Sequence, residues 1–176
     1  MCAIEVTPVV ATERLILRGP VRNDAVALAH LLNDLNVAGM TSKIPHPYGL
    51  ADAEAWLDRA MTCDFRDQAD FVIEHRNFGV VGGLGFKPGD RPELGYWIGR
   101  PYWNRGYATE AVRAALRWVK RDWRRNVVVA GHFTDNPASG QVLCKAGFLY
   151  TGDVELRPSA ARGGAQVPTR MMVWLA

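Results

Sequence analysis

The pattern of apolar and polar positions divides the chain of 176 residues into strands and amphipathic helices. Residues 13–18, ERLILR, alternate enough to predict a strand. Apolar residues at helical spacing predict helices over 24–34 and 51–61, the first of them capped by Asn23 or Asp24. Between these helices, TSKIPHPYGL contains two prolines, which favours an ordered loop.

The middle of the chain predicts an antiparallel meander of strands over 70–75, 80–86 and 93–99, joined by the turns RNFG and KPGDRP. Helices and strands then alternate over the rest of the chain. The expected order is a helix over 108–123, a strand over 127–133, a helix over 137–146, a strand over 148–152, a long loop, and a strand over 169–175. Because crossovers through a helix join parallel neighbours, this order predicts an α+β fold with a mixed sheet.

Composition and charge fit one globular domain over residues 1–176, with 48% hydrophobic and 22% charged residues. A net charge of +3 permits an anionic small ligand without requiring nucleic acid. The three cysteines, Cys2, Cys63 and Cys144, are odd in number and widely spaced, so we expect no metal site and no disulfide framework. The first residues lack the features of a signal peptide, and no run approaches the ~18 apolar residues that span a bilayer. We therefore expect a cytoplasmic protein with no membrane partner.

The segment YWNRGYATE, residues 102–110, places a single glycine just before a predicted helix. A helix N-terminus has unpaired backbone N–H groups and a partial positive charge, so it can bind an anion. Gly106 has no Cβ and lets a bulky anion approach the backbone, and Ala108 adds only a small side chain beside it. Arg105 and Arg100 can add charge. Taken alone, the segment fits either a pyrophosphate site or a plain turn between a strand and a helix.

A second segment, NPASGQVLCKAGF at 136–148, has Asn136 and Ser139 at the start of a predicted helix. W-x-x-G-Y-A-T-E-A, followed one strand later by N-P-x-S and K-x-G-F, resembles the GNAT family of acyl-CoA-dependent N-acyltransferases. ERLILR, IPHPY and ELGYWIG, in that order, are similar to the branch that holds the ribosomal-protein alanine N-acetyltransferases. The resemblance covers nearly the whole chain, and its specificity lies in the order and spacing of the segments.

The resemblance implies a mixed, mostly antiparallel central sheet of about seven strands, with about four helices packed on both faces. It also implies that acetyl-CoA lies in a V between two diverging strands. Its pyrophosphate would contact the backbone of 104–109, its pantetheine arm would contact 97–99 and Asn136, and its sulfur would lie near Ser139. The residues implied to bind the cofactor are Trp97, Ile98, Gly99, Trp103, Asn104, Arg105, Gly106, Tyr107, Ala108, Thr109, Asn136, Ser139 and Lys145.

The implied chemistry is direct attack of an amine on the thioester. A backbone N–H near Ile98 can stabilise the oxyanion. Glu93, which begins the strand beside the cofactor, is the candidate base, with His46 and Glu155 as weaker alternatives. Glu93 is equally explained as a solvated residue after a proline turn. Ser139, Glu93 and Asn136 are therefore the candidate catalytic residues.

Two positions depart from the wider family. Many members have a tyrosine seven residues after the asparagine, which protonates the leaving sulfur, and here that position is Leu143. Ser139 is then the best remaining donor, and hydrogen bonding to the thiolate suits its weak acidity better than full proton transfer. Asn104 stands where a glycine is usual, and we expect the turn to survive because asparagine tolerates left-handed backbone.

The helix after the turn has arginines at 113, 117, 121 and 124 along one face. This face is either solvated or a patch for ribosomal RNA or an acidic partner, and Arg113 could instead help bind the CoA phosphates.

We therefore predict an N-acetyltransferase that moves acetyl from acetyl-CoA to a primary amine. The acceptor is a protein N-terminus, such as that of a ribosomal protein, or a small amine. The alternatives are a non-catalytic acyl-CoA sensor and a ribosome- or nucleic-acid-binding protein that uses the basic helix 109–125. The sequence leaves the oligomeric state open, a homodimer included.

Overall fold

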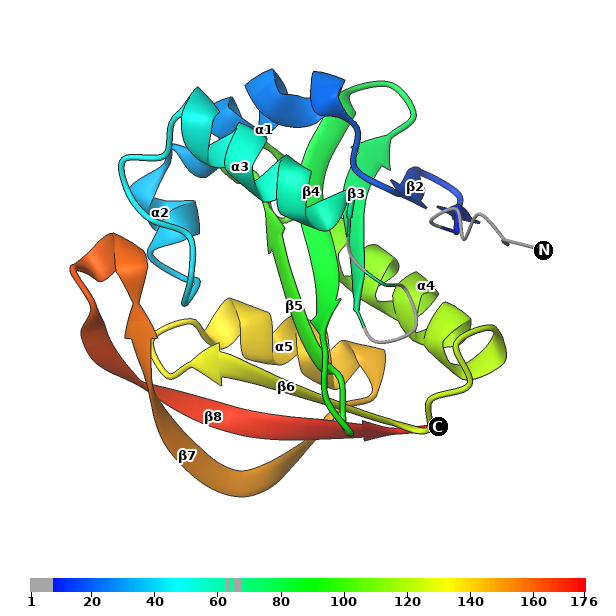
Figure 1. Ribbon diagram of the computed structural model, residues 1–176. Helices are drawn as coiled ribbons and strands as arrows, with labels where there is room; N and C mark the ends of the chain where they lie inside the picture. Colours follow the sequence, from blue (N-terminus) through cyan, green and yellow to red (C-terminus); the bar gives the residue numbers. More distant parts are fainter. Residues whose placement is uncertain (1–7, 63, 65–67) are drawn as a thin grey trace.

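The computed structural model describes residues 8–62, 64 and 68–176, and its centre is a strongly twisted β-sheet (Figure 1). In the described chain the sheet has eight strands in the order β1-β2-β3-β4-β5-β6-β8-β7. Their bounds are β1 Val10–Ala11, β2 Leu15–Arg18, β3 Ala69–His75, β4 Gly79–Lys87, β5 Glu93–Ile98, β6 Val127–Phe133, β7 Leu149–Ser159 and β8 Ala165–Leu175. Among the strands of the described residues, only β5 and β6 pair in parallel, so the predicted mixed, mostly antiparallel sheet is confirmed.

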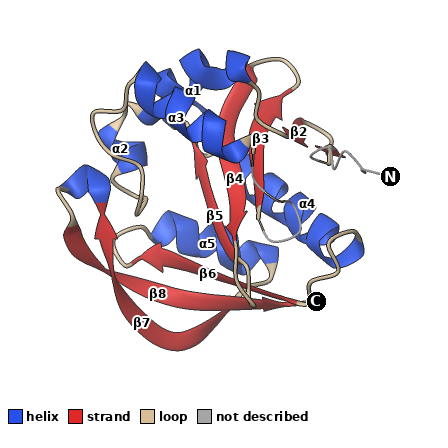
Figure 2. Cartoon of the chain, viewed as in Figure 1, coloured by secondary structure: helices blue, strands red, loops and turns tan. Residues whose placement is uncertain are grey.

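Helices cover both faces of this sheet, as predicted (Figure 2). The α-helices are α1 Ala25–Leu32, α2 Leu35–Ala38, α3 Leu50–Ala60, α4 Tyr107–Arg121 and α5 Pro137–Ala146. Short 3-10 turns are η1 Arg22–Asp24, η2 Arg100–Tyr102 and η3 Ala160–Arg162. Helices α4 and α5 pack with the strands around the main core, while α1 and α3 form a second core with Val80 and Trp97 on the opposite face.

Helix α4 is amphipathic as predicted, but it ends at Arg121, so Arg124, which was predicted on its basic face, lies beyond it in left-handed backbone. Val112, Ala115 and Val119 have no exposed surface, since they face the sheet. The basic positions Arg113 and Arg117 are exposed on the other side. Burial of the Val112 and Val119 side chains stabilises the fold by about 1.5–3 kcal/mol each.

The prediction of a long loop between 152 and 169 is wrong. Strand β7 continues to Ser159 and β8 begins at Ala165, so the two form a long antiparallel hairpin. Strand β7 lies at the edge of the sheet and is exposed along most of its length, so it lacks the alternation that marks a half-buried strand. Strand β7 includes Pro158, which an edge strand tolerates. The sequence likewise missed β1 and α2, which are too short to show a period.

The tip of this hairpin is tied to the loop that follows α2. Ser159 Oγ donates to the Thr41 carbonyl at 3.1 Å, and the Ala160 N–H donates to the Ser42 carbonyl at 3.0 Å. Arg162 Nε donates to the Gly39 carbonyl at 2.7 Å.

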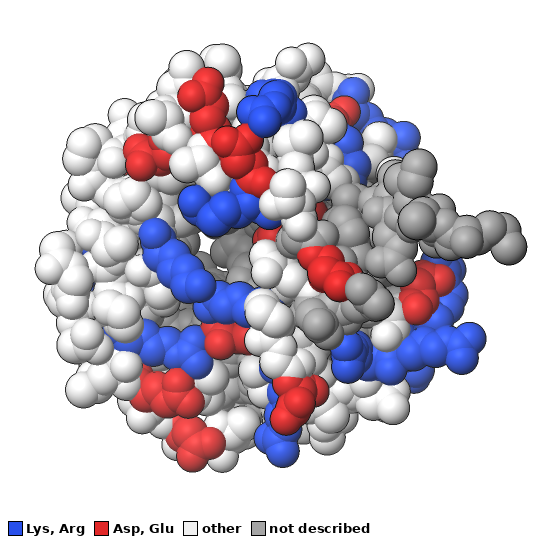
Figure 3. Space-filling model, in the orientation of Figure 1, with Lys and Arg blue, Asp and Glu red and all other residues white. Residues whose placement is uncertain are grey.

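The face of the molecule seen in Figure 1 is hollowed at its centre, with Lys and Arg side chains along the hollow (Figure 3).

Candidate active site

Strands β5 and β6 separate soon after they meet. They pair only at Glu93 with Val129 and at Leu94 with Ala130, although β5 continues to Ile98 (Figure 1). Backbone groups alternate sides along a strand, and the Gly99 N–H bonds to Val81 on β4. The N–H groups of Tyr96 and Ile98 therefore point away from β4, into the wedge between β5 and β6.

This alternation refines the implied role of residues 97–99. The backbone groups of Trp97 and Gly99 face β4, so of the three only Ile98 turns its backbone toward the wedge. Trp103 closes the outer end of this edge, because its Nε1 donates to the Ile98 carbonyl at 2.6 Å. The wedge thus has an inward-facing N–H at Ile98, where the oxyanion contact was expected.

The turn before α4 has the backbone that an anion site needs. Asn104 has φ 60° and Gly106 has φ 79°, both in the left-handed region. The first helical hydrogen bond runs from the Glu110 N–H to the Gly106 carbonyl. Gly106 provides no side-chain cap. The N–H groups of residues 107–109 therefore have no acceptor within the helix.

Glu110, the acid of the YWNRGYATE segment, holds this turn against the residues that join β1 to β2. Its carboxylate accepts hydrogen bonds from Thr12 Oγ1 at 2.7 Å and from Arg14 Nε at 2.7 Å. Arg14 in turn donates Nη1 to the Arg105 carbonyl at 3.0 Å and lies over the Tyr107 ring. Burial alone would raise the pKa of Glu110, but the hydrogen bonds from Thr12 and Arg14 lower it below its ordinary value. Sequence reasoning gave Glu110 no role, although its place in the motif was a signal.

Helix α5 begins on the other side of the wedge with Asn136. Asn136 Oδ1 accepts the Ser139 N–H at 3.3 Å, which leaves the amide Nδ2 of Asn136 as a donor. Ser139 Oγ lies 2.7 Å from the hydroxyl of Tyr96, which comes from β5. The Tyr96 hydroxyl also lies 3.1 Å from the Ser139 carbonyl oxygen. Tyr96, which the sequence analysis did not single out, thus bridges the two walls of the wedge.

Leu143, one turn after Ser139, lies in the main core with no exposed surface. Its position on α5 is therefore used for packing. This agrees with the expectation that it cannot donate a proton, and the hydroxyls of Ser139 and Tyr96 are donors at this end of the wedge.

Glu93 is partly buried and is paired with two cations rather than free in solvent. It lies at the closed end of the wedge and is bound by Arg157 Nη1 at 2.5 Å and by Lys87 Nζ at 3.1 Å. Burial would raise the pKa of Glu93, but the hydrogen bond from Arg157 and the charges of Lys87 and Arg157 lower it. Glu155 also pairs with Arg157, and His46 is exposed on the loop before α3.

The face of β5 opposite to Tyr96 has open space above Gly95, where an added Cβ would meet nothing within 4 Å. On the neighbouring strand, a Cβ at Gly85 would lie 2.5 Å from the carboxylate of Asp70. Burial raises the pKa of Asp70, while a hydrogen bond from Gln68 and the charge of Lys43 oppose the rise. The two carboxylates of this face, Asp70 and Glu93, thus have pKa values moved in opposite directions.

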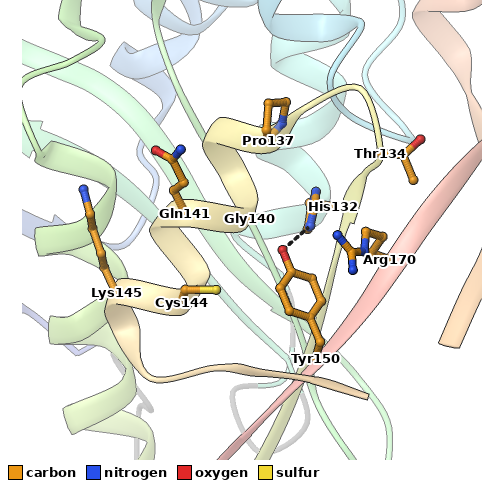
Figure 4. Close-up of a pocket in the computed structure, with 9 residues that line it drawn as sticks. All are labelled: His132, Thr134, Pro137, Gly140, Gln141, Cys144, Lys145, Tyr150 and Arg170. Carbon is orange, nitrogen blue, oxygen red and sulfur yellow. Dashed lines mark hydrogen bonds between the residues drawn. The ribbon is translucent and has the colours of Figure 1, made fainter. Parts of the chain in front are cut away.

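Three of the predicted basic residues can be placed by their neighbours in the protein. Lys145 lines a cavity of about 400 Å³ between α5 and strands β6, β7 and β8 (Figure 4). In that view Lys145 points away from His132 and Tyr150, which bond to each other at 3.0 Å. Arg113 donates to the Lys145 carbonyl at 2.6 Å, and Arg100 lies 3.7 Å from Asp34. Their contacts with CoA remain predictions.

Within the described residues, no three or more His, Cys, Asp or Glu side chains gather as a metal site. None of the described helices is long and apolar enough to cross a membrane. Cys144 is an exposed free thiol, whereas Cys2 and Cys63 lie outside the described residues.

Comparison with known families shows which family this chain belongs to. Residues 14–149 match the family described as the acetyltransferase (GNAT) domain. The chain belongs to the GNAT family. It is therefore an acetyl-CoA-dependent acetyltransferase, and the resemblance drawn from its motifs is confirmed.

Two curated relatives and one solved structure give the wider setting. An uncharacterized N-acetyltransferase, YoaA of Bacillus subtilis, is 29% identical over 159 residues, which cover 82% of this chain and 85% of YoaA. The ribosomal protein uS5-alanine N-acetyltransferase of Escherichia coli is 34% identical over 59 residues, covering 34% of this chain and 30% of the enzyme. The spermidine N-acetyltransferase of Vibrio cholerae, solved with CoA and spermine, has a TM-score of 0.78 at 18% identity, covering 93% and 96% of the two chains.

Proposed function

We propose that this GNAT protein transfers an acetyl group from acetyl-CoA to a primary amine, by direct attack of the amine while both substrates are bound. The observation that carries the proposal is that β5 leaves β6 after two residue pairs and is followed by the uncapped N-terminus of α4. A pyrophosphate fits at the N-terminus of α4 and a thioester fits in the wedge. We expect the protein to act in the cytoplasm.

The turn before α4 would bind the pyrophosphate through the N–H groups of residues 107–109. The absence of a Cβ at Gly106 and the left-handed backbone at Asn104 and Gly106 keep these groups accessible. Charge-assisted hydrogen bonds of this kind contribute about 1.5–3 kcal/mol each.

Inside the wedge, the inward N–H of Ile98 would bind the pantetheine arm or the thioester oxygen, where negative charge develops during attack. The Asn136 amide would donate to a pantetheine carbonyl, since its Oδ1 already caps α5. Ser139 would donate to the departing sulfur. These residues bind and orient the acetyl donor, which supplies the activated acyl group.

The amine would approach from the other face of β5, above Gly95. Glu93 is the candidate base, acting through water. Its lowered pKa means that it is ionised at neutral pH but is a weak base. A weak base suffices in this reaction, because the nitrogen becomes strongly acidic once it has added to the thioester. The acceptor remains either a protein N-terminus, as for the uS5 enzyme, or a small amine, as for the spermidine enzyme.

The proposal is tested by incubating the purified protein with acetyl-CoA and a panel of peptides and small amines, while free thiol is followed with a thiol reagent. We expect acetyl-CoA to bind in titration calorimetry and thiol release to depend on one class of amine. CoA binding without thiol release across a broad panel would favour the sensor instead. Binding of ribosomal RNA with a steep salt dependence, and no binding of CoA, would favour the basic helix.

A further inference from the structure

We infer that Tyr96 is a positioning residue of the acetyl-transfer reaction: its hydroxyl, reaching across the wedge from β5, aims the Ser139 hydroxyl at the sulfur that leaves. This inference rests on the proposed function, because it assigns a partner to the residue proposed to contact the sulfur. The observation behind it is the 2.7 Å contact between the two hydroxyl oxygens.

The two hydroxyls have two arrangements of their protons. In the first, the Tyr96 O–H donates to the Ser139 carbonyl at 3.1 Å, and the Ser139 O–H donates to the tyrosine oxygen at 2.7 Å. In the second, the Tyr96 O–H donates to Ser139 Oγ, and the serine proton is free to point elsewhere. Rotation about two C–O bonds converts one arrangement into the other.

Only the second arrangement serves the leaving thiolate. A thiolate accepts hydrogen bonds, so it attracts the serine proton, and the serine oxygen then accepts the proton of Tyr96. The hydroxyl of Tyr96 thus polarises Ser139 and keeps its oxygen in place. Without that hydroxyl, the serine side chain can rotate toward its own helix carbonyls instead.

Tyr96 holds its own proton throughout this step. Burial raises the pKa of Tyr96, and its hydrogen bond to Ser139 offsets only part of the rise, so loss of the phenol proton is disfavoured. In the reaction, the N–C bond forms and the C–S bond breaks with its electron pair on sulfur. The proton that the amine nitrogen loses balances the one that the released thiol gains. Tyr96 and Ser139 lower the energy of the thiolate before that proton arrives.

This arrangement also explains how the chain manages with Leu143 in place of the family's usual tyrosine. Leu143 and Ser139 lie one turn apart on α5, and the Leu143 side chain is buried in the main core. The phenol at this end of the wedge comes from the opposite wall, on β5, and it acts through the serine.

The test uses the full chain with CoA alone, so that it needs no acceptor. The pKa of the bound CoA thiol is measured from the ultraviolet absorbance of the thiolate, in the wild type and in Tyr96→Phe. We expect the pKa of the thiol to rise by about 1 in the variant, which is a tenfold loss of preference for the thiolate. CoA affinity measured below that pKa should stay within about twofold of the wild type.

The matched control is Tyr150→Phe, which removes a phenol hydroxyl bonded to His132 on the other side of α5. It should leave the pKa of the CoA thiol unchanged. Tyr96→Phe in a Ser139→Ala background should add no further change, because the two hydroxyls act as a unit. A far-ultraviolet circular dichroism spectrum and a melting curve show whether each variant is folded.

The outcomes separate this inference from the function on which it rests. Failure of the wild type to bind CoA contradicts the proposed function itself. CoA binding with the same thiol pKa in the wild type and Tyr96→Phe leaves the function standing and overturns the role of Tyr96. A shift that is equally large in Tyr150→Phe, or that persists without Ser139, also overturns it.

Discussion

Two residues with left-handed backbone, Asn104 and Gly106, shape the turn that presents the first N–H groups of α4. The sequence allowed Asn104 to be predicted in this region, because asparagine is among the few side chains that enter it readily. It also indicated that Leu143 could not act as an acid. The sequence could not reveal Tyr96, because its contact with Ser139 joins residues 43 positions apart in the chain.

At this scale, Gly106→Val should abolish acetyl-CoA binding. A β-branched residue is strained at φ 79°, and its Cβ would lie 3.5 Å from Nη2 of Arg14, which holds the turn, so the N–H groups proposed to bind the pyrophosphate should be displaced. Titration calorimetry with acetyl-CoA measures the loss, which we expect to exceed about tenfold.

Gly79→Val is the matched control, because Gly79 has φ 72° and is the first residue of β4, with nothing near its Cβ position. It should lower the melting temperature through strain and leave the affinity for acetyl-CoA intact. Normal acetyl-CoA binding by Gly106→Val would contradict the assignment of the turn.

At the scale of elements, α4 is attached to the sheet at both its apolar face and its first turn. Its 3.6-residue period was clear in the sequence, so its extent and its buried face were predicted well. Its attachment to the turn between β1 and β2 through Glu110, Thr12 and Arg14 was not, since long-range ion pairs leave no local pattern. The β7–β8 hairpin was missed for a related reason, because an edge strand has no buried face to set a period.

Glu110→Gln should loosen the turn and weaken acetyl-CoA binding without changing the side chains proposed to contact it. We expect a loss of about 1–2 kcal/mol in the free energy of unfolding, since Arg14 is partly exposed and the pair is screened. Urea denaturation measures this change, and calorimetry measures the affinity.

The pH dependence of this pair has a definite sign. The folded pKa of Glu110 lies below its ordinary value of 4.5, so the pair stabilises the protein above that pH. The stability difference between the wild type and Glu110→Gln should be full at neutral pH and shrink as the pH falls below about 4.5. A difference that stays constant down to pH 3 would show that the carboxylate charge is not what matters.

At the scale of the whole molecule, the sheet has two working faces. Helices α4 and α5 cover the face where Tyr96 meets Ser139, and the other face has open space above Gly95. The hairpin tip and the loop after α2 are hydrogen-bonded to each other, although their sequences do not name an acceptor. The basic face of α4 lies away from the wedge, and its role in binding RNA stays a prediction.

Gly95→Leu should weaken binding of the amine and leave binding of acetyl-CoA unchanged. Its side chain would fill the open space on the acceptor face, so the KM for the amine should rise by roughly tenfold or more while the affinity for acetyl-CoA is kept. Gly95→Ala, which adds one methyl group, is the control and should behave nearly as the wild type. Equal losses in acetyl-CoA and amine binding would contradict the assignment of the two faces.

The brief pairing of β5 with β6 also has a mechanical consequence. Two residue pairs are a short seam between the five strands β1–β5 and the three strands β6–β8, and α4 and α5 brace that seam from beneath. An extended molecule hydrogen-bonded along the open edge of β5 would restrict movement of strands β1–β5 relative to strands β6–β8. The donor substrate would thereby set the angle at which the acceptor face is held.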